Sequence, residues 1–421
     1  MKAIIYFNFI ISVLFTLCYA YQFFYVLVGL FLKPKKFEAK CNHKYAIVIS
    51  ARNESAVIGN LIRSIKTQKY PSELIDIFVI ADNCTDDTAK VSRREGAKVY
   101  ERFNEEQIGK GYALNWFFDR LKEDNKEDDY EAFMIFDADN VLDSNFVSEM
   151  NKVFDNGYRI ITSYRNSKNY DSNWISAGYS LWFLREAKYL NHARMRIGTS
   201  CAISGTGFLV STDVFKENGG WIHHLLTEDI EFTTDSIIKG EKIGYCDSAI
   251  LYDEQPHIFK QSYIQRLRWA KGFYQVFRGY GARLIKGVFK GNFSCYDMLM
   301  TLMPAMLLTL SCVVVNVVAI SVGLIRQSPE MGELMEVLVQ TFLSFYCVFF
   351  ALGAVTTVTE RRQIHCDGLK KFKYLFTFPI FMMTYVPISI IALFKKVEWS
   401  PITHSLSKTV SDIRNKDTVI K

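Results

Sequence analysis

The sequence predicts an α/β domain held between membrane-spanning helices. Three observations carry this prediction: an uncharged run of residues at the N-terminus, an alternation of short strands and helices in the middle, and further apolar runs after residue 290. The chain has 421 residues, of which 49% are hydrophobic, and the hydrophobic residues gather toward its two ends. This length allows one large domain or two ordinary ones.

The N-terminal run predicts a membrane helix over residues 1–33. No charged residue occurs between Ala3 and Leu32, which is longer than the ~20 residues needed to cross a bilayer core. A cleaved signal peptide has a shorter apolar core and a small-residue cleavage site. The segment instead continues into "KPKK", and this basic flank predicts that its C-terminal end lies in the cytoplasm.

The C-terminal region 290–396 contains three more apolar runs, at about 298–325, 337–358 and 374–394. The basic loop "ERRQIHCDGLKKFK" between the last two favours the cytoplasm. Three crossings place the polar tail, 397–421, outside, yet the last run is followed by several cations (Lys395, Lys396, Lys408, Arg414 and Lys416). Pro379 and Pro387 offer an alternative, in which the last run is re-entrant or interfacial.

Charge and cysteine usage narrow the class of protein. The net charge of +6 is explained by basic loops and contact with anionic lipid, and no basic stripe interleaved with aromatics indicates nucleic-acid binding. The nine cysteines are odd in number and contain no CxxC pair. They predict reduced thiols on a cytoplasmic or membrane-embedded protein.

The middle of the chain, residues 43–285, predicts a parallel sheet covered by helices on both faces. Expected strands (45–50, 75–82, 97–102 and 130–139) alternate with expected helices (55–68, 87–96, 110–124 and 145–154). Ligands bind such sheets at the carboxyl ends of the strands. A dinucleotide site is excluded because no GxGxxG follows the first strand, and "SGTGF" at 204–208 holds only one GxG.

Acidic residues gather at these strand ends, in "SARNES", "ADNCTDD" and "DADN". Asp137 and Asp139, two residues apart, can both supply oxygen ligands to Mg²⁺ or Mn²⁺ beside a phosphate. The alternative is a structural Asp-rich turn, in which Asn140 and Asp143 cap the next helix.

A second acidic motif, "LLTEDIEF", begins another helix. Thr227 is the expected N-cap, and Glu228 and Asp229 occupy the first turn. Asp229, kept ionised by the helix N-terminus, is a candidate general base. Ordinary capping is the alternative for this pair.

Residues 262–277, "SYIQRLRWAKGFYQVF", predict an amphipathic helix. Arg268 is suited to neutralise a departing diphosphate, and Trp269 to stack on a sugar ring. Lys110 supplies a second cation at a helix start. The alternatives are an interfacial helix with snorkelling cations and an exposed lysine.

The ordered set "SARNESAVI", "ADNCTDDTA", "GKGYALN", "FDADN", "SGTGF", "LLTEDIEF" and "QRLRW" resembles family 2 glycosyltransferases over residues 45–275. The likeness is to synthases related to cellulose, chitin and hyaluronan synthases. It implies a Rossmann-like GT-A domain that binds a UDP-sugar with Mg²⁺ or Mn²⁺. The implied site comprises a catalytic set (Asp229, Glu228 and Arg268), a nucleotide-sugar set (Arg52, Glu54, Asp82, Lys110 and Asp137), metal ligands (Asp139 and Asp137) and an acceptor and diphosphate set (Gln265 and Trp269).

This resemblance predicts an inverting enzyme of the plasma membrane, with a cytoplasmic catalytic domain, that extends a β-linked polysaccharide and works with export partners. One alternative is a non-processive enzyme that adds a single sugar to a membrane lipid. Another is a catalytically silent scaffold in a secretion complex, although every expected acidic position is occupied.

Overall fold

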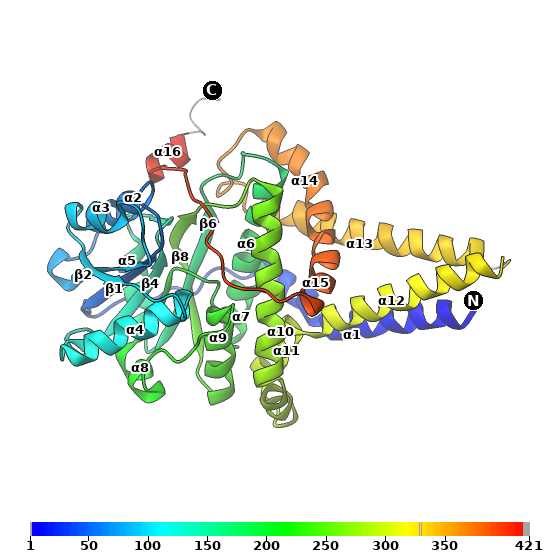
Figure 1. Cartoon of the computed structure of the whole chain (residues 1–421), viewed down its shortest axis with the longest axis horizontal. Helices are drawn as coiled ribbons and strands as arrows, with labels where there is room; N and C mark the ends of the chain where they lie inside the picture. Colours follow the sequence, from blue (N-terminus) through cyan, green and yellow to red (C-terminus); the bar gives the residue numbers. More distant parts are fainter. Residues whose placement is uncertain (1, 328, 330, 416–421) are drawn as a thin grey trace.

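A computed structural model describes residues 2–327, 329 and 331–415 of the chain. It has an α/β domain at one end and long helices at the other (Figure 1). Three of these helices, α1 (Lys2–Phe31), α12 (Pro304–Ile325) and α13 (Met331–Thr359), extend together away from the domain. Near the outer end of α1, the Asn8 and Asn316 side chains exchange hydrogen bonds of 2.9 and 2.8 Å, which join α1 to α12 inside the apolar bundle.

The centre of the α/β domain is an eight-stranded sheet in the order β3-β2-β1-β4-β7-β6-β8-β5. Its strands are β1 (Tyr45–Ala51), β2 (Ile75–Asp82), β3 (Lys98–Arg102), β4 (Ala132–Asp137), β5 (Val141–Leu142), β6 (Ile160–Ser167), β7 (Phe208–Ser211) and β8 (Ile243–Asp253). The first four strands are parallel, as the sequence predicts. The prediction of a wholly parallel sheet is wrong, however, because β7 is antiparallel to both β4 and β6.

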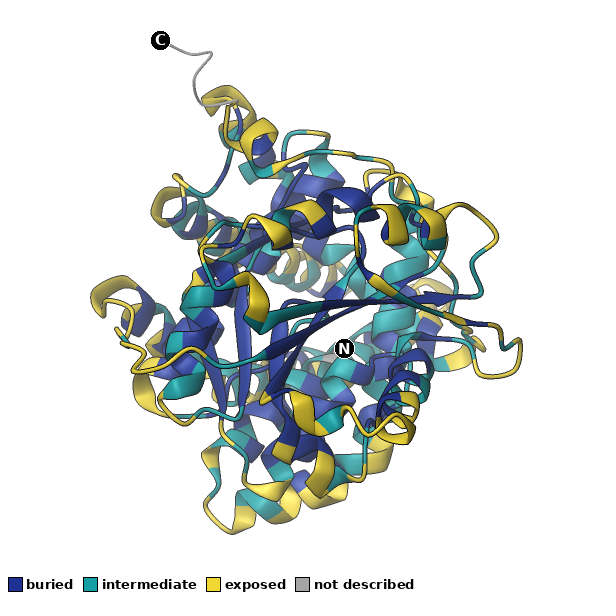
Figure 2. Cartoon of the chain, turned by 90° about the vertical axis from the view of Figure 1, so that its left-hand side faces the viewer, coloured by how far each residue is buried: buried dark blue, intermediate teal, exposed yellow. Residues whose placement is uncertain are grey.

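Helices cover both faces of the sheet, and Figure 2 shows its strands buried behind helices whose outer faces are exposed. These helices are α2 (Ile58–Lys66), α3 (Thr88–Arg94), α4 (Lys110–Glu123), α5 (Phe146–Asp155), α6 (Trp174–Glu186), α7 (His192–Ile197), α8 (Thr212–Asn218), α9 (Glu228–Lys239) and α10 (Phe259–Phe289). Short turns of helix lie at Ser72–Leu74, Glu127–Asp129 and Ala187–Asn191. Each expected strand and helix is present, but α10 is nearly twice as long as expected, with 31 residues.

The expected layout of one N-terminal and three C-terminal apolar segments is confirmed. Four helical segments are long and apolar enough to cross a membrane: Lys2–Phe31, Phe293–Ile325, Met331–Thr359 and Gly368–Phe394. The second of them combines α11 (Phe293–Leu302) with α12.

The last apolar segment differs from the other three. It is divided at Thr384 into α14 (Gly368–Met383) and α15 (Tyr385–Phe394), which lie beside α10 and run crosswise to α1, α12 and α13 (Figure 1). The Arg266 side chain of α10 donates to Thr384 Oγ1 at 2.6 Å, and Lys271 donates to the Ala392 carbonyl at 3.0 Å. This segment is therefore fastened along its length to the α/β domain.

The tail after α15 packs on the α/β domain. Asn60 of α2 donates to Ser407 Oγ at 2.7 Å, and α16 (Val410–Arg414) ends with Arg414 paired to Asp143. Figure 1 shows the tail crossing the domain from α15 to α16. The described part of the tail thus lies on the same side of the long helices as the α/β domain.

Candidate active site

The carboxyl ends of β1, β2 and β4 open into a cavity of about 1160 Å³. Its lining includes every residue in the predicted site: Arg52, Glu54, Asp82, Lys110, Asp137, Asp139, Glu228, Asp229, Gln265, Arg268 and Trp269. The cavity continues between α1, α12, α13 and α15. One space therefore joins the acidic strand ends to the membrane helices.

Asp137 and Asp139 differ in their surroundings. The Asp137 side chain is 40% exposed toward the cavity, and Lys110 Nζ lies 2.5 Å from its Oδ1. Asp139 is buried, and its carboxylate accepts from Asn140 Nδ2 at 3.2 Å and from the Glu254 backbone N–H at 2.7 Å. Asn140 thus orients Asp139 rather than capping α5, whose N-cap position is Asn145.

The "SGTGF" segment, which the sequence left without a role, is the loop that supports these aspartates. Thr206 Oγ1 accepts from the Asp137 backbone N–H at 2.9 Å and donates to Asn140 Oδ1 at 2.5 Å. Lys110 Nζ also donates to the Gly205 carbonyl at 2.8 Å. The loop therefore fixes the position of both the aspartate pair and the lysine.

Lys110 is the first residue of α4, and the position after it, Gly111, has no room for a side chain. A Cβ on Gly111 would lie 2.3 Å from the His223 carbonyl oxygen. Helix α4 and the segment before α9 therefore touch through backbone, and this contact brings Lys110 beside the "TED" motif.

We expect Gly111→Ala to lower the melting temperature and the activity together. The added methyl forces backbone apart, which costs ~1–3 kcal/mol, and moves Lys110 from Asp137. The control is Gly279→Ala in α10, where nothing lies within 4 Å of the added Cβ. That exposed helical substitution should be neutral or stabilise by ~0.5–1 kcal/mol. Equal melting temperatures for the two variants would contradict the close contact.

Glu228 and Asp229 lie in the first turn of α9, as expected. Burial raises the pKa of both carboxyls, that of Glu228 to about 7, although Lys110 and Arg268 oppose the shift. The helix N-terminus therefore does not hold Asp229 in its ordinary ionisation range, and burial outweighs it. A carboxylate with a raised pKa is a stronger base, which suits the expected role of Asp229.

Thr227 has the expected N-cap position of α9, but its side chain makes no capping hydrogen bond. Its side chain instead packs against Gly272 of α10, where a Cβ would lie 2.4 Å from Thr227 Oγ1. This close approach brings the "QRLRW" part of α10 to the start of α9.

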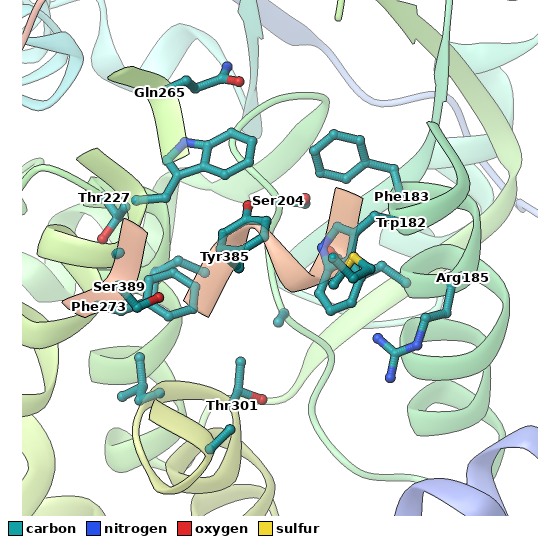
Figure 3. Close-up of a pocket in the computed structure, with 18 of the residues that line it drawn as sticks. Trp182, Phe183, Arg185, Ser204, Thr227, Gln265, Phe273, Thr301, Tyr385 and Ser389 are labelled. Carbon is teal, nitrogen blue, oxygen red and sulfur yellow. The ribbon is translucent and has the colours of Figure 1, made fainter. Parts of the chain in front are cut away.

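The residues of α10 face the cavity with different chemistry. Arg268 Nη1 donates to the Leu226 carbonyl at 3.3 Å, close to Asp229, and Gln265 Oε1 is buried without a hydrogen-bond partner (Figure 3). The Trp269 ring packs edge-on against Tyr179 and Phe183. The arginine is thus available to an anion, and the amide to a hydroxyl.

The end of the cavity beside β1 and β2 contains Asp82 and Arg52. Asp82 is buried in an ion pair with Arg102, with 2.6 Å between Nη1 and Oδ1. The Arg52 guanidinium lies 5.2 Å from the centre of the Trp399 ring, and its Nη1 is buried without a partner. The sequence did not single out Arg102, because a charged residue at the end of a short strand is ordinary.

The tail supplies residues that the sequence missed entirely. His404 Nδ1 lies 2.8 Å from Glu54 Oε1, and Glu254 accepts from the backbone N–H groups of Ser405 and Leu406 at 2.9–3.2 Å. Burial disfavours the charged imidazole, but the carboxylates of Asp139, Glu54 and Glu254 raise the pKa of His404 to about 10. A protonated histidine therefore adds positive charge beside Asp139.

We expect Trp399→Ala to raise the KM for the nucleotide donor about 2- to 30-fold, because cation–π contacts contribute ~0.5–2 kcal/mol and this one fixes Arg52 at the donor site. Trp116→Ala is the matched control. Its ring also lies over an arginine, Arg120, at 5.9 Å, but it does not line the cavity. Equal donor KM values in the two variants would exclude Trp399 from the donor site.

The carboxylate oxygens of the site suit a divalent cation as ligands. Asp137 and Asp139 present carboxylate oxygens at one strand end, and hard cations such as Mg²⁺ and Mn²⁺ prefer oxygen ligands. Burial disfavours ionised Asp139, but His404 and Lys168 hold its pKa below the usual value, so it is available as an anion. In the described site these positive side chains balance the acidic pair.

Comparison with known proteins agrees with this geometry. The family model described as "Glycosyltransferase like family 2" matches residues 43–272, more than half of the chain. The chain belongs to glycosyltransferase family 2. The match begins just before β1 and ends within α10, so it contains both acidic motifs and the arginine of "QRLRW".

Curated relatives of this glycosyltransferase include enzymes with different products. It is 25% identical to the probable glycosyltransferase YdaM of Bacillus subtilis, over 58% of each chain. It is 24% identical to a beta-monoglucosyldiacylglycerol synthase of Nostoc, over 66% of this chain and 59% of the relative. It is 23% identical to a poly-beta-1,6-N-acetyl-D-glucosamine synthase of Staphylococcus epidermidis, over 58% and 60%. The chain thus spans less than two thirds of the length of these relatives.

Among solved structures, the mannosyltransferase PcManGT from Pyrobaculum calidifontis, in complex with GDP-Man and Mn²⁺, shares the fold. Its TM-score is 0.57 at 13% identity, over 91% of this chain and 98% of that one. This similarity supports the GT-A fold of the family 2 glycosyltransferase described here.

Proposed function

We propose that this membrane glycosyltransferase transfers a sugar from a UDP-sugar, with Mg²⁺ or Mn²⁺, to an acceptor hydroxyl that reaches it from the membrane side. The observation that carries this proposal is the single cavity: Asp137, Asp229 and Arg268 line the same space as α1, α12 and α13. A donor held at the strand ends then lies opposite an acceptor held by the membrane helices.

The chemistry is a direct displacement at the anomeric carbon. Asp229 accepts the proton of the acceptor hydroxyl as the new C–O bond forms and the bond to the diphosphate breaks. Arg268 and Lys110 stabilise the negative charge of the departing UDP. Asp139 and Asp137 would hold a divalent cation, which would supply Lewis acid stabilisation of the same charge. Attack from the face opposite the leaving group inverts the anomeric configuration, so an α-linked donor gives a β-linked product.

Roles in donor binding follow from position. Asp82 and Arg52, with Glu54 beside them, lie at the ends of β1 and β2, where the uridine is expected. Gln265 and Trp269 lie between that region and the membrane helices, where the acceptor is expected. The unpartnered Gln265 Oε1 is an acceptor for a sugar or lipid hydroxyl.

Of the two acceptors that the sequence leaves open, a membrane lipid fits the cavity best. Most side chains that line it between the membrane helices are apolar, among them Phe9, Phe345, Val348 and Leu352. Lipid acyl chains pack favourably against such an apolar surface, because the contact removes both from water.

A growing β-linked polysaccharide is the second candidate. Gln265, Arg268 and Trp269 match the signature of processive synthases. In addition, α1 presents polar side chains to the cavity at helical spacing: Asn8, Ser12, Thr16 and Tyr19. These hydroxyls and the amide suit contact with sugar. This candidate also needs export partners beyond the chain.

The position of the tail bears on the topology. We infer that α1, α12 and α13 cross the plasma membrane and that α14 and α15 lie at its inner surface, which leaves the catalytic domain and the basic tail in the cytoplasm. This arrangement follows the Pro379 and Pro387 alternative for the last apolar run. It also explains the lysines of the tail, which would be outside the cell if all three C-terminal segments crossed the membrane.

The decisive experiment is product size. Purified full-length protein in a detergent without sugar is incubated with UDP-glucose, UDP-N-acetylglucosamine or UDP-galactose, membrane lipid extract and Mg²⁺ or Mn²⁺. Metal-dependent UDP release with a single glycolipid supports the lipid acceptor, and a polymer supports the polysaccharide. Absence of UDP release with every donor would contradict the proposed activity.

A further inference from the structure

Arg185 of α6 is a buried cation at the cavity wall that forms no ion pair with a described carboxylate. It is 8% exposed, and its Nη2 donates to Gln22 Oε1 of α1 at 2.7 Å. Its Nε is buried without a hydrogen-bond partner. Among the residues that the structure describes, no acidic oxygen lies within the 4.0 Å of an ion pair. Figure 3 shows Arg185 projecting into the pocket on the side where Thr301 lies.

The neighbouring arginine shows how the protein satisfies a structural cation in this region. Arg194 forms two hydrogen bonds of 2.7 and 2.8 Å with the Asp297 carboxylate, which also accepts from Tyr21 and Tyr25 at 2.8 Å. Arg194 is thus fully paired, whereas Arg185 has only a neutral amide and the face of Trp182 at 4.8 Å. Burial lowers the pKa of Arg185 to about 10, despite the attraction of the nearby Glu186, so it is still charged at neutral pH. A buried charge without an ion-pair partner is costly unless a ligand supplies the opposite charge.

The position of Arg185 identifies the source of the counter-charge. Its partner Gln22 lies within a group of tyrosines on α1, Tyr19, Tyr21 and Tyr25. Tyrosines of membrane helices gather at the headgroup level of the bilayer. Gln22 therefore places the guanidinium near the depth at which lipid phosphates lie. An arginine fork matches phosphate geometry and can bind two of its oxygens.

We propose that Arg185 binds the phosphate of the acceptor lipid, so that the acceptor is a phosphate-bearing lipid rather than a neutral diacylglycerol or a free glycan. This inference rests on the proposed function. The acyl chains lie along the apolar wall formed by α12 and α13, and the headgroup extends toward Asp229, which lines the same cavity.

The transfer balances without a further reactant. The lipid hydroxyl loses its proton to the Asp229 carboxylate, its oxygen bonds to the anomeric carbon, and UDP leaves with the electron pair of the broken bond. The phosphate takes no part in the bond changes. Arg185 is accordingly a binding residue for the acceptor and should affect its KM.

The test compares full-length wild type, Arg185→Gln, Arg185→Lys and the control Arg196→Gln in a sugar-free detergent. Arg196 is an exposed arginine of α7 outside the cavity. Four probes are offered: phosphatidylglycerol, whose headgroup has free hydroxyls, a polyisoprenyl phosphate, which has none and therefore tests binding alone, diacylglycerol and a soluble oligosaccharide. Lipid retention is measured by native mass spectrometry without donor, and UDP release is then measured with donor.

We expect Arg185→Gln to weaken retention of the phosphate lipid at least 10-fold and to raise its KM by a similar factor, with the donor KM unchanged. Arg185→Lys should lose less, and Arg196→Gln should match wild type. Whichever of the two phosphate lipids is retained identifies the source. Retention of diacylglycerol equal to that of both phosphate lipids, or use of the oligosaccharide alone, would overturn the inference.

A second measurement does not depend on the folding of an Arg185 variant. Brominated phosphatidylglycerol or brominated polyisoprenyl phosphate should quench the fluorescence of Trp182, which contacts Arg185. The part of the quenching that is due to Trp182 should be absent in Trp182→Phe. Brominated diacylglycerol that quenches Trp182 as strongly would count against a phosphate site. If no donor yields UDP, the proposed activity is wrong. The binding measurements still show whether Arg185 binds a lipid phosphate.

Discussion

Asp229→Asn should lower kcat about 10²- to 10⁴-fold and leave UDP binding close to wild type, because general base catalysis typically contributes that factor. The side chain lies at the start of α9 and lines the cavity beside Arg268. Asparagine has nearly the same shape but cannot accept the proton of the acceptor hydroxyl. The measurement is initial-rate UDP release, combined with UDP affinity from calorimetry.

The matched control for this substitution is Asp213→Asn. Asp213 also lies in the first turn of a helix, α8, but it is exposed and outside the cavity, so its variant should turn over at the wild-type rate. The pH profile is an independent check. Because burial raises the pKa of Asp229 above its ordinary 3.8, the activity of wild type should fall as the pH drops through that raised value. A wild-type rate in Asp229→Asn would remove Asp229 from the mechanism.

The first half of the sheet was predictable because each strand is a local pattern. β1, β2 and β4 are apolar runs that end in polar residues, and the helices between them have clear periodicity. The insertion of β7 between β4 and β6 has no such signal. β7 has four residues, and its antiparallel pairing joins Phe208 to Ile135, which is far away in sequence.

The predicted site residues line one cavity because parallel strands end at one edge of the sheet. The sequence could not show which distant side chains pair with the charged residues of the cavity and so control their ionisation. Glu54 and His404 are 350 residues apart, and Arg165 and Asp253 are 88 apart. Local patterns contain no information on such pairs, and a lone histidine in a polar tail is ordinary. The sequence also placed Thr227 at the N-cap of α9, but it could not show that its side chain packs against Gly272 and makes no capping bond.

The described tail also changes the character of the donor site. Through Trp399 and His404, the proposed nucleotide end of the cavity is built jointly by β1, β2 and a segment that follows the apolar helices. Because the tail continues from α15, the last apolar segment is joined directly to the residues around the proposed donor site.

Asp139→Asn should abolish metal-dependent activity, with a loss larger than the ~10- to 100-fold in metal affinity that outer-shell changes cost. Asp139 is 5% exposed and is held by Asn140 and the Glu254 backbone N–H. An amide there removes the negative charge, and it keeps one oxygen where two now accept, from Asn140 Nδ2 and the Glu254 N–H, so its NH₂ group faces one of these donors. The protonated His404 also loses a counter-charge. Metal binding is measured by Mn²⁺ electron paramagnetic resonance, and activity by a Mn²⁺ titration.

Asp143→Asn is the control from the same acidic stretch. Asp143 pairs with Arg414 at the far end of the tail and does not line the cavity, so its variant should keep the Mn²⁺ affinity and the rate of wild type. If both variants lose activity equally, the effect belongs to folding of the loop and not to a metal ligand. If Asp139→Asn binds Mn²⁺ as wild type does, Asp137 remains as the candidate ligand. Its 40% exposed side chain and its pairing with Lys110 then predict that Lys110→Met tightens metal binding, because the competing cation is gone.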